Sequence, residues 1–136
     1  MQVSTKGKYA LRFLLDLCEH QDETVIPLKD VAERQNISKK YLERVISLLA
    51  PSNMLRITRG YQGGYQLTRD PKDITVAEVL RLTEGSLSPV DYASLEEDDI
   101  TLGVWEKLES SIVDCLEGIS LQDILDEYSP TIEYYI

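Results

Sequence analysis

The sequence predicts a mainly α-helical protein with a small β-hairpin wing: a winged helix-turn-helix followed by a long dimerisation helix. Two helical segments separated by a sharp turn come first, and the second of them is basic. Two short alternating strands around a glycine-rich tip follow directly. After residue 101, apolar residues recur at alternating steps of three and four, which is the pattern of a helix–helix interface.

Length and composition are those of one globular domain. The 136 residues are 43% hydrophobic and 28% charged, which is ordinary for a soluble protein. The apolar runs are too short to cross a bilayer and no signal peptide is recognisable, so we expect a cytoplasmic protein with no membrane partner. Within one compact domain we distinguish a winged helix-turn-helix region (1–85), an acidic loop (86–100) and a dimerisation helix with a C-terminal segment (101–136).

The charge of the chain is split between its two halves. The formal net charge is −10, which by itself argues against a nucleic-acid partner. Residues 1–72, however, hold twelve Lys/Arg and eight Asp/Glu, whereas residues 73–136 hold two and sixteen. The front half is therefore basic enough to bind DNA, and the acidic rear would repel phosphates and help to orient the molecule.

Residues 4–20 have the apolar spacing of a first helix. Lys6 and Lys8 lie near its start, together with Arg12. This basic cluster either contacts DNA phosphate or forms a solvated face, and the sequence favours neither reading over the other.

A helix-turn-helix is predicted after residue 27. Its first helix, residues 28–35, carries a small residue, Ala32, that lets the second helix approach closely. Asn36 follows four positions later and tolerates a left-handed turn. Leu42 then packs the second helix onto the first, and Ser38 is a suitable N-cap for it.

The second of these helices, residues 38–50, is the candidate recognition helix. Its early turns carry polar side chains of the kind that reach base edges and phosphates. The candidate DNA-binding residues on it are Ser38, Lys39, Lys40, Tyr41, Glu43 and Arg44. The alternative is a solvated amphipathic helix, and the hairpin that follows favours DNA binding over it.

Residues 55–68 are predicted to form the wing. Apolar residues of its two strands share one side, and glycines relieve the chain at the tip. Arginine on a thin hairpin suits the negative potential of a minor groove. The candidate DNA-binding residues are Arg59, Gly60, Gly63 and Gly64, with Arg56 and Arg69 nearby. An ordinary flexible hairpin is the alternative; an enzyme's phosphate loop is disfavoured because no Gly-Lys-Ser/Thr sequence ends the tip.

The rear half is predicted to supply scaffold and interface. Thr75 and Glu78 form a capping box that opens a helix, and Gly85 ends it. Residues 86–100 read as a loop of solvated charge. The next helix carries an apolar seam of Trp105, Leu108, Ile112, Cys115 and Ile119. This seam is either core or, as we prefer, a dimer interface, because reading a palindrome requires two-fold symmetry.

The end of the chain carries a last short helix after Ser120 and an apolar, aromatic tail, residues 130–136. The tail docks either on its own domain or on a partner. No enzyme is expected and no catalytic residue is assigned. The sequence shows no nucleophile–base pairing and no metal-ligand spacing, and a single histidine, His20, leaves little for acid–base chemistry.

From the wing onward the sequence resembles a known family. The segments Ile37-Ser-Lys-Lys-Tyr-Leu-Glu43, Arg59-Gly-Tyr-Gln-Gly-Gly-Tyr-Gln-Leu67 and Ile74-Thr-Val-Ala-Glu-Val-Leu80 are similar to those of the Rrf2 family of bacterial transcription regulators. The resemblance implies a dimer that crosses long helices between protomers, with recognition helices in major grooves and wings in minor grooves. It also implies that Ser38, Lys40, Tyr41, Glu43 and Arg44 face bases and phosphates and that Arg59 and Gly60 enter the minor groove.

The resemblance breaks down at the cofactor. Family members that bind an iron–sulfur cluster place three closely spaced cysteines before the dimer helix, but Ser86 to Val104 contains none. Cys18 and Cys115 lie far apart, and a cluster typically needs four ligands. We therefore expect no cofactor and no metal site, as in the cluster-free subgroup that includes the repressor of cysteine metabolism.

The function expected from the sequence is a dimeric DNA-binding transcription regulator that reads a palindromic operator. Of the two kinds of regulator, we favour a repressor over an activator. Its expected partners are double-stranded DNA, a second copy of the chain, and a partner protein or small-molecule effector. The alternative is a winged-helix interaction module or co-regulator without direct DNA binding, which the acidic rear and the aromatic tail favour.

Overall fold

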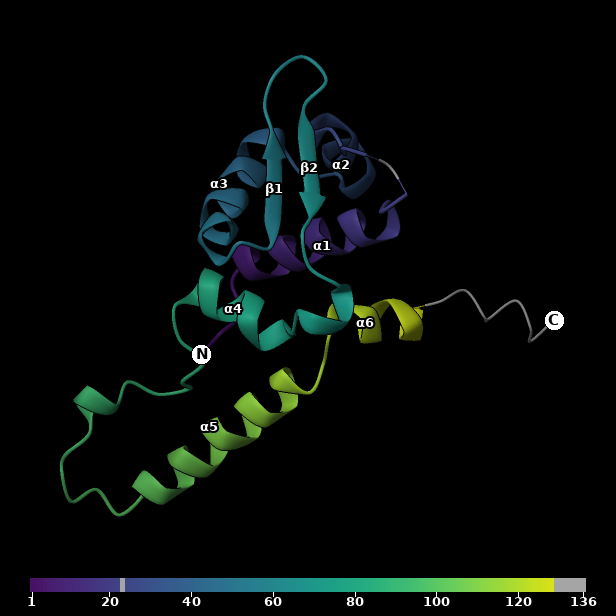
Figure 1. Cartoon of the computed structure of the whole chain (residues 1–136). Helices are drawn as coiled ribbons and strands as arrows, with labels where there is room; N and C mark the ends of the chain where they lie inside the picture. The colour runs from purple at the N-terminus through teal and green to yellow at the C-terminus, as the bar shows by residue number, and fades with distance from the viewer. Residues whose placement is uncertain (23, 129–136) are drawn as a thin grey trace.

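The computed structural model describes residues 1–22 and 24–128. Over these residues the chain forms six α-helices, one two-stranded antiparallel sheet and three short 3₁₀ turns (Figure 1). The helices are α1 Thr5–Glu19, α2 Leu28–Gln35, α3 Lys39–Leu49, α4 Val76–Glu84, α5 Leu102–Glu117 and α6 Leu121–Tyr128. The strands are β1 Leu55–Thr58 and β2 Gly64–Leu67, and the turns are Ala50–Ser52, Pro71–Asp73 and Tyr92–Ser94.

This is the mainly helical fold with one hairpin that the sequence predicts. No helix in the described ranges is both long enough and apolar enough to pass through a bilayer. The predicted docking of the 130–136 tail lies outside the described residues.

The helix boundaries follow from local signals in the sequence. Ser4, Ser38 and Thr75 each cap a helix, because each side chain accepts a hydrogen bond from the backbone N–H three residues later. Asn36 adopts the left-handed conformation, with a φ of 54°, and so turns α2 into α3. Gly85 ends α4 in the same region, with a φ of 80°.

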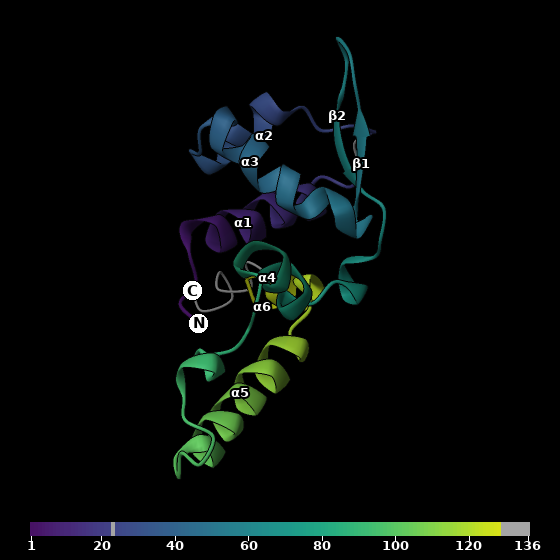
Figure 2. The ribbon, with the colours of Figure 1, turned by 90° about the vertical axis from the view of Figure 1, so that its left-hand side faces the viewer.

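Helix α1 is the central element of the body. It packs against α2, α3, α4, α6 and β2, and Figure 2 shows it between the helix-turn-helix and α4. The side chains of Phe13, Leu14 and Leu17 on α1 are fully buried, as are Leu42 and Leu49 on α3. Each such side chain stabilises the fold by roughly 1.5–3 kcal/mol through removal of apolar surface from water. Helix α3 is therefore held rigidly on α1.

One buried carboxylate, that of Asp16, fixes the C-terminal end of α2, the first helix of the helix-turn-helix. It lies on α1, is 1% exposed, and accepts hydrogen bonds from the Arg34 guanidinium at 2.8 and 3.1 Å and from the Gln35 amide at 2.9 Å. Burial alone would raise the pKa of this carboxyl. The hydrogen bonds, with the charges of Arg34 and His20, outweigh burial and lower the pKa below its ordinary value.

The hairpin is tied to the body at its base. Leu55 pairs with Leu67 and Ile57 with Tyr65, so these four side chains share one side as the sequence predicts. A bridge between Ile26 and Tyr65 extends the pairing: each residue's N–H donates to the other's carbonyl, at 3.0 and 2.8 Å. The loop before α2 therefore acts as a third, very short strand that anchors β2.

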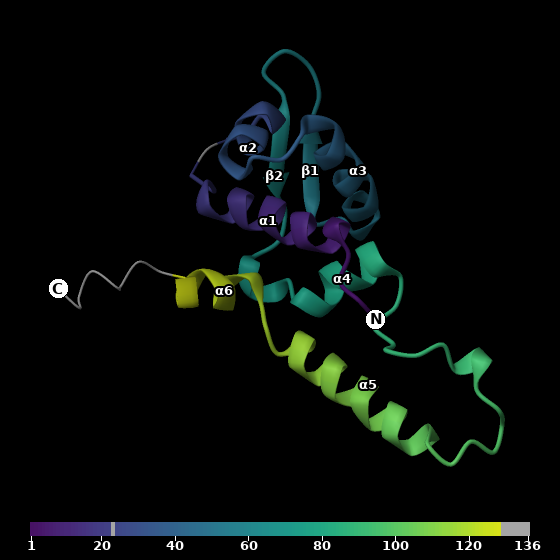
Figure 3. The ribbon, with the colours of Figure 1, turned by 180° about the vertical axis from the view of Figure 1, so that it is seen from behind.

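The rear of the molecule returns to the body after a long excursion. Figures 1 and 3 show α5 and the preceding segment extending away from the other helices. The chain then rejoins the body next to α4, where the Leu121 N–H donates to the Ile74 carbonyl and the Val76 N–H to the Ile119 carbonyl, both at 2.9 Å. Leu121 is fully buried. Helix α6 is thus fixed to the core, whereas α5 has no buried residue along its length.

Candidate nucleic-acid interface

A groove separates α3 from the wing. It has a volume of about 420 Å³ and is lined by Leu28, by Lys39 and Glu43 of α3, and by residues 57–60 and 63–65 of the hairpin. Predicted site residues from two segments, Lys39 and Glu43 on the helix and Arg59 with three glycines on the wing, therefore face a common space.

Charged groups on both walls of the groove, α3 and the wing, act on the same side chain. Burial raises the pKa of the Tyr65 phenol, the nearby Glu43 carboxylate raises it further, and Arg59 opposes both effects. Glu43 of the helix and Arg59 of the wing thus act on one side chain at the groove floor. The groove therefore carries both signs of charge, which a surface that only attracts phosphate would not need.

Helix α3 presents its polar side outward. Ser38, Lys39, Lys40, Glu43 and Arg44 are all exposed, while the opposite side of the helix is buried in the core. These exposed groups lie in the first half of the helix, which is the half that reaches base edges in helix-turn-helix proteins.

Tyr41 differs from its neighbours because it is half-buried. Its ring meets that of Tyr9 on α1 edge to face, with the centroids 5.1 Å apart. The Arg44 guanidinium lies 5.8 Å from the centroid of the Tyr41 ring, within reach of a cation–π contact. Tyr41 thereby links α3 to α1 and contacts Arg44.

The wing glycines are needed for backbone geometry. A Cβ on Gly63 would lie 2.1 Å from the Thr58 carbonyl oxygen, and a Cβ on Gly64 would lie 2.3 Å from that of Ile26. Gly60 has a φ of 105°, a conformation that other residues rarely adopt. Packing within the chain therefore accounts for Gly63 and Gly64 whether or not they also approach DNA.

The arginines around the wing separate into two kinds. Arg56 and Arg59 are exposed. Arg69 is engaged: it donates to Glu78 on α4 at 2.6 and 3.0 Å and to the Asp73 carbonyl at 2.7 Å, and these bonds to Glu78 raise its pKa. Because Glu78 binds Arg69, only the Thr75 half of the predicted capping box forms. Arg69 thus fastens the wing's exit to α4.

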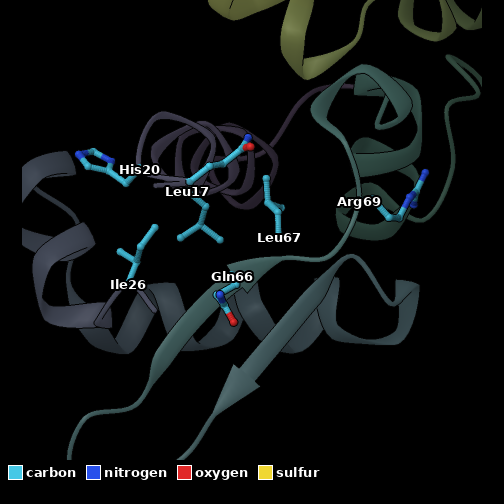
Figure 4. Close-up of a pocket in the computed structure, with 7 residues that line it drawn as sticks. Leu17, His20, Ile26, Gln66, Leu67 and Arg69 are labelled. Atoms are coloured by element: carbon cyan, nitrogen blue, oxygen red, sulfur yellow. The ribbon is translucent and has the colours of Figure 1, made fainter. Parts of the chain in front are cut away.

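A small cavity lies behind the wing. It has a volume of about 120 Å³ and is lined by Leu17, His20, Gln21, Ile26, Gln66, Leu67 and Arg69. Figure 4 shows these side chains between the end of α1 and β2, with Arg69 at the edge nearest α4. His20 is held there by its Nδ1, which lies 2.8 Å from the Asp16 carbonyl oxygen. The cavity belongs to the wing's support and lies apart from the groove beside α3.

The two predicted lysines of α1 stand outside the groove. Lys8 is exposed, whereas Lys6 is half-buried and close enough to Glu84 to help lower the pKa of that carboxyl. Glu84 also accepts hydrogen bonds from the Ser4 backbone N–H at 2.7 Å and the Ser4 hydroxyl at 2.9 Å. The start of α1 is therefore attached to α4, and Lys8 is the freer of the two lysines.

The apolar seam of α5 remains largely uncovered. Leu108 is 42% exposed, Cys115 is exposed, and Trp105 and Ile112 are half-buried. Val104, which the sequence reading missed, is 57% exposed beside them. Ile119, the last residue of the predicted seam, lies beyond the end of α5 and packs on a cluster built around Val76, Ala77, Leu80 and Leu87.

The thiols do not fit an iron–sulfur cluster. Cys18 is buried in α1, and burial raises the pKa of its thiol to about 12, so the thiolate that a cluster requires is strongly disfavoured. Cys115 is exposed on α5, and the chain has no third cysteine. Among residues 1–22 and 24–128, no group of three or more His, Cys, Asp or Glu side chains is placed to hold a metal ion.

Comparison with known proteins agrees with this architecture. The model of the Rrf2 family, described as iron-dependent transcriptional regulators, matches residues 3–127. The transcriptional regulator CymR of Bacillus subtilis is 32% identical, over 91% of this chain and 89% of that protein. The transcriptional regulator IscR of Photorhabdus laumondii is 34% identical, over 93% of this chain and 80% of that protein.

The solved structures point the same way. The structure of CymR, the global cysteine regulator of B. subtilis, has a TM-score of 0.82 at 30% identity and covers 93% of this chain and 98% of its own. The matched relatives are transcriptional regulators and not enzymes, in agreement with the absence of an assigned catalytic residue. The chain belongs to the Rrf2 family and is a DNA-binding transcriptional regulator.

Proposed function

We propose that the protein is a homodimeric repressor that reads a palindromic operator, with α3 in the major groove and the wing in the adjacent minor groove. The observation that carries this proposal is the groove beside α3. It brings Lys39 and Glu43 of the helix to face Arg59 and Gly60 of the wing. A duplex that occupies this surface would meet base-reading groups and phosphate-binding groups together.

Each exposed side chain of α3 has a role suited to its chemistry. Lys39, Lys40 and Arg44 would neutralise phosphates or donate to guanine, and the Ser38 hydroxyl would bind phosphate. Glu43 would accept from the N4 amino group of cytosine and reject the acceptor edges of guanine. Lys8, and to a lesser degree Lys6, would contact phosphate at the flank. These assignments rest on the exposure of the side chains and on the family resemblance.

A second copy of the chain is the partner that fits α5. Its apolar seam is exposed at Val104, Leu108 and Cys115 and half-buried at Trp105, although the C-terminal end of the helix is tied to the body. Two such helices crossing about a two-fold axis would bury the seam and set two recognition helices against the half-sites of a palindrome.

We propose that the regulator works without an iron–sulfur cluster, despite the iron dependence described for the family. The donor set supports this, because one thiol is buried and protonated and no third cysteine exists. A partner protein or a small molecule would then carry the signal, in the cytoplasm where the DNA lies. Oxygen-free purification tests the point: we expect a colourless protein, and cluster absorption in its visible spectrum would contradict the proposal.

Arginine 59 provides the direct test of DNA binding. An operator would first be selected from random duplexes, and Arg59→Ala would then be titrated by gel shift. We expect a loss of about tenfold, with a salt slope reduced by about one, because one phosphate or minor-groove contact is removed. Lys72→Ala is the control, since Lys72 is an exposed cation remote from the groove. Equal loss in both variants, or no loss in either, would remove the wing from the binding surface.

A further inference from the structure

We propose that Tyr61, at the tip of the wing, reads the minor groove and makes the regulator prefer A·T pairs where the wing meets the operator. This inference rests on the proposed insertion of the wing into a minor groove. It adds a specificity-determining residue to that function, because Arg59 responds to the negative potential of the groove rather than to the edge of one base.

The first observation is the exposure of the side chain. Tyr61 is 99% exposed, so its ring packs on nothing in the described parts of the chain. The other tyrosine of the hairpin, Tyr65, lies edge to face with Phe13 at 5.8 Å and belongs to the core margin. A large aromatic side chain left wholly in water contributes nothing to folding, and aromatic rings of this kind are enriched where proteins bind partners.

The second observation is the shape of the tip. The Gly63 N–H donates to the Gly60 carbonyl at 3.0 Å, which closes a tight turn over Tyr61 and Gln62. The residues on both sides of this pair are glycines, so no Cβ thickens the backbone there. The result is a narrow strip of main chain with one ring at its end, and a minor groove only about 6 Å wide admits such a strip.

The third argument is the chemistry of the groove floor. A·T pairs present only acceptors there, adenine N3 and thymine O2, whereas G·C pairs add the guanine 2-amino group. The phenol hydroxyl can donate to those acceptors, and the ring can lie against the sugar walls. A 2-amino group would stand in the path of the ring. Proteins that bind the minor groove read this difference between A·T and G·C pairs, and they frequently insert apolar or aromatic side chains there.

The exposure of Tyr61 also makes the test clean. Tyr61→Ala and Tyr61→Phe remove no packing contact, so thermal unfolding should match the wild type. Ile100→Ala is the matched control, since Ile100 is an apolar residue that is 98% exposed and lies outside the hairpin. The DNA probe is the operator selected by the wild-type protein. In a second version, 2,6-diaminopurine replaces adenine where the wing makes its footprint. This base adds the 2-amino group in the minor groove and leaves the major-groove edge of adenine unchanged.

We expect wild type and Ile100→Ala to bind the diaminopurine operator about tenfold more weakly than the unmodified one. Tyr61→Ala should bind the unmodified operator about tenfold more weakly and should no longer distinguish the two DNAs. Tyr61→Phe should keep most of the discrimination, because it retains the ring. Discrimination that survives in Tyr61→Ala would overturn the role of Tyr61 while leaving the wing in place. A wild-type protein that selects no operator would overturn the proposed function as well.

Discussion

At the scale of single residues, Asp16 shows how much one buried charge can hold. Its carboxylate accepts three hydrogen bonds from the end of α2 and is 1% exposed. We expect Asp16→Asn to lower the free energy of unfolding by about 2–3 kcal/mol, because a neutral amide at this position leaves the charge of Arg34 inadequately paired. Arg34 remains partly hydrated, which keeps the loss at the lower end of the usual range. Urea denaturation measures this, with exposed Asp22→Asn as the control.

The same carboxylate gives the fold a defined dependence on pH. Its pKa in the folded state is lowered from the ordinary value of 3.8. A lowered pKa means that the stabilisation is fully present above that value and is lost as the pH falls below it. Wild type should therefore lose stability on acidification below about pH 4 more steeply than Asp16→Asn does. Parallel acid-denaturation curves for the two proteins would contradict this account.

At the scale of elements, the hairpin depends on close backbone contacts at its base. Gly64→Ala would place a Cβ 2.3 Å from the Ile26 carbonyl oxygen, where neither strand can yield easily. We expect a loss of about 1–3 kcal/mol in thermal or urea unfolding, with weaker DNA binding as the wing detaches. Gly103→Ala is the matched control: a Cβ there meets nothing within 4 Å, and alanine should stabilise α5 by up to about 1 kcal/mol.

Helix α5 supplies the second prediction at this scale. Leu108→Glu should convert a dimer into a monomer in light scattering, because a charge in the centre of an apolar interface lacks a partner. The monomer should keep its helical content, since α5 has no buried residue. Lys107→Glu changes charge at the adjacent exposed position, off the seam, and should remain dimeric. A dimeric Leu108→Glu protein would place the interface elsewhere.

Sequence reasoning succeeded where one local signal decides the structure. The turns at Asn36 and Gly85 are predicted by residue type, because both residue types tolerate the left-handed conformation. The hairpin register is predicted by the alternation of Leu55, Ile57, Tyr65 and Leu67. It failed where distant segments compete for one side chain. Glu78 looked like a capping partner of Thr75, but Arg69, nine residues away, takes its carboxylate.

The other misses have the same origin. The apolar spacing of α1 predicts only an apolar face and a solvated face, so it does not indicate that Asp16 is buried. Nothing near Asp16 in sequence reveals its partners, Arg34 and Gln35. Sequence reasoning missed the packing role of the wing glycines, because the Ile26 segment that constrains Gly64 lies far back in the chain. Their predicted contact with DNA stays a prediction. A glycine pair directly after a turn was the one available signal for close packing there.

At the scale of the whole molecule, we expect the split of charge between the two halves of the chain to affect how selectively the protein binds DNA. The acidic run Glu96, Glu97 and Asp98 is exposed and lies away from the α3 groove. We expect its conversion to Gln, Gln and Asn to strengthen binding to non-operator DNA about two- to fivefold at low salt. The effect should vanish above about 0.15 M salt, where the Debye length falls to about 8 Å. Filter binding across a salt series measures it, and an unchanged non-specific affinity would show that the rear exerts no orienting field.

The bridge between Ile26 and Tyr65 has a consequence for how such a regulator can diversify. It locks the base of the hairpin to the body, while residues 60–62 touch little else in the described chain. The base of the hairpin and its tip are thus held in place independently of each other. Substitutions at Tyr61 and Gln62 can accumulate without a stability cost, whereas Gly60 is held by its positive φ. New operators can therefore be explored by drift in these two positions while the core stays under constraint. The same separation makes the tip a natural grafting site for engineered DNA preference.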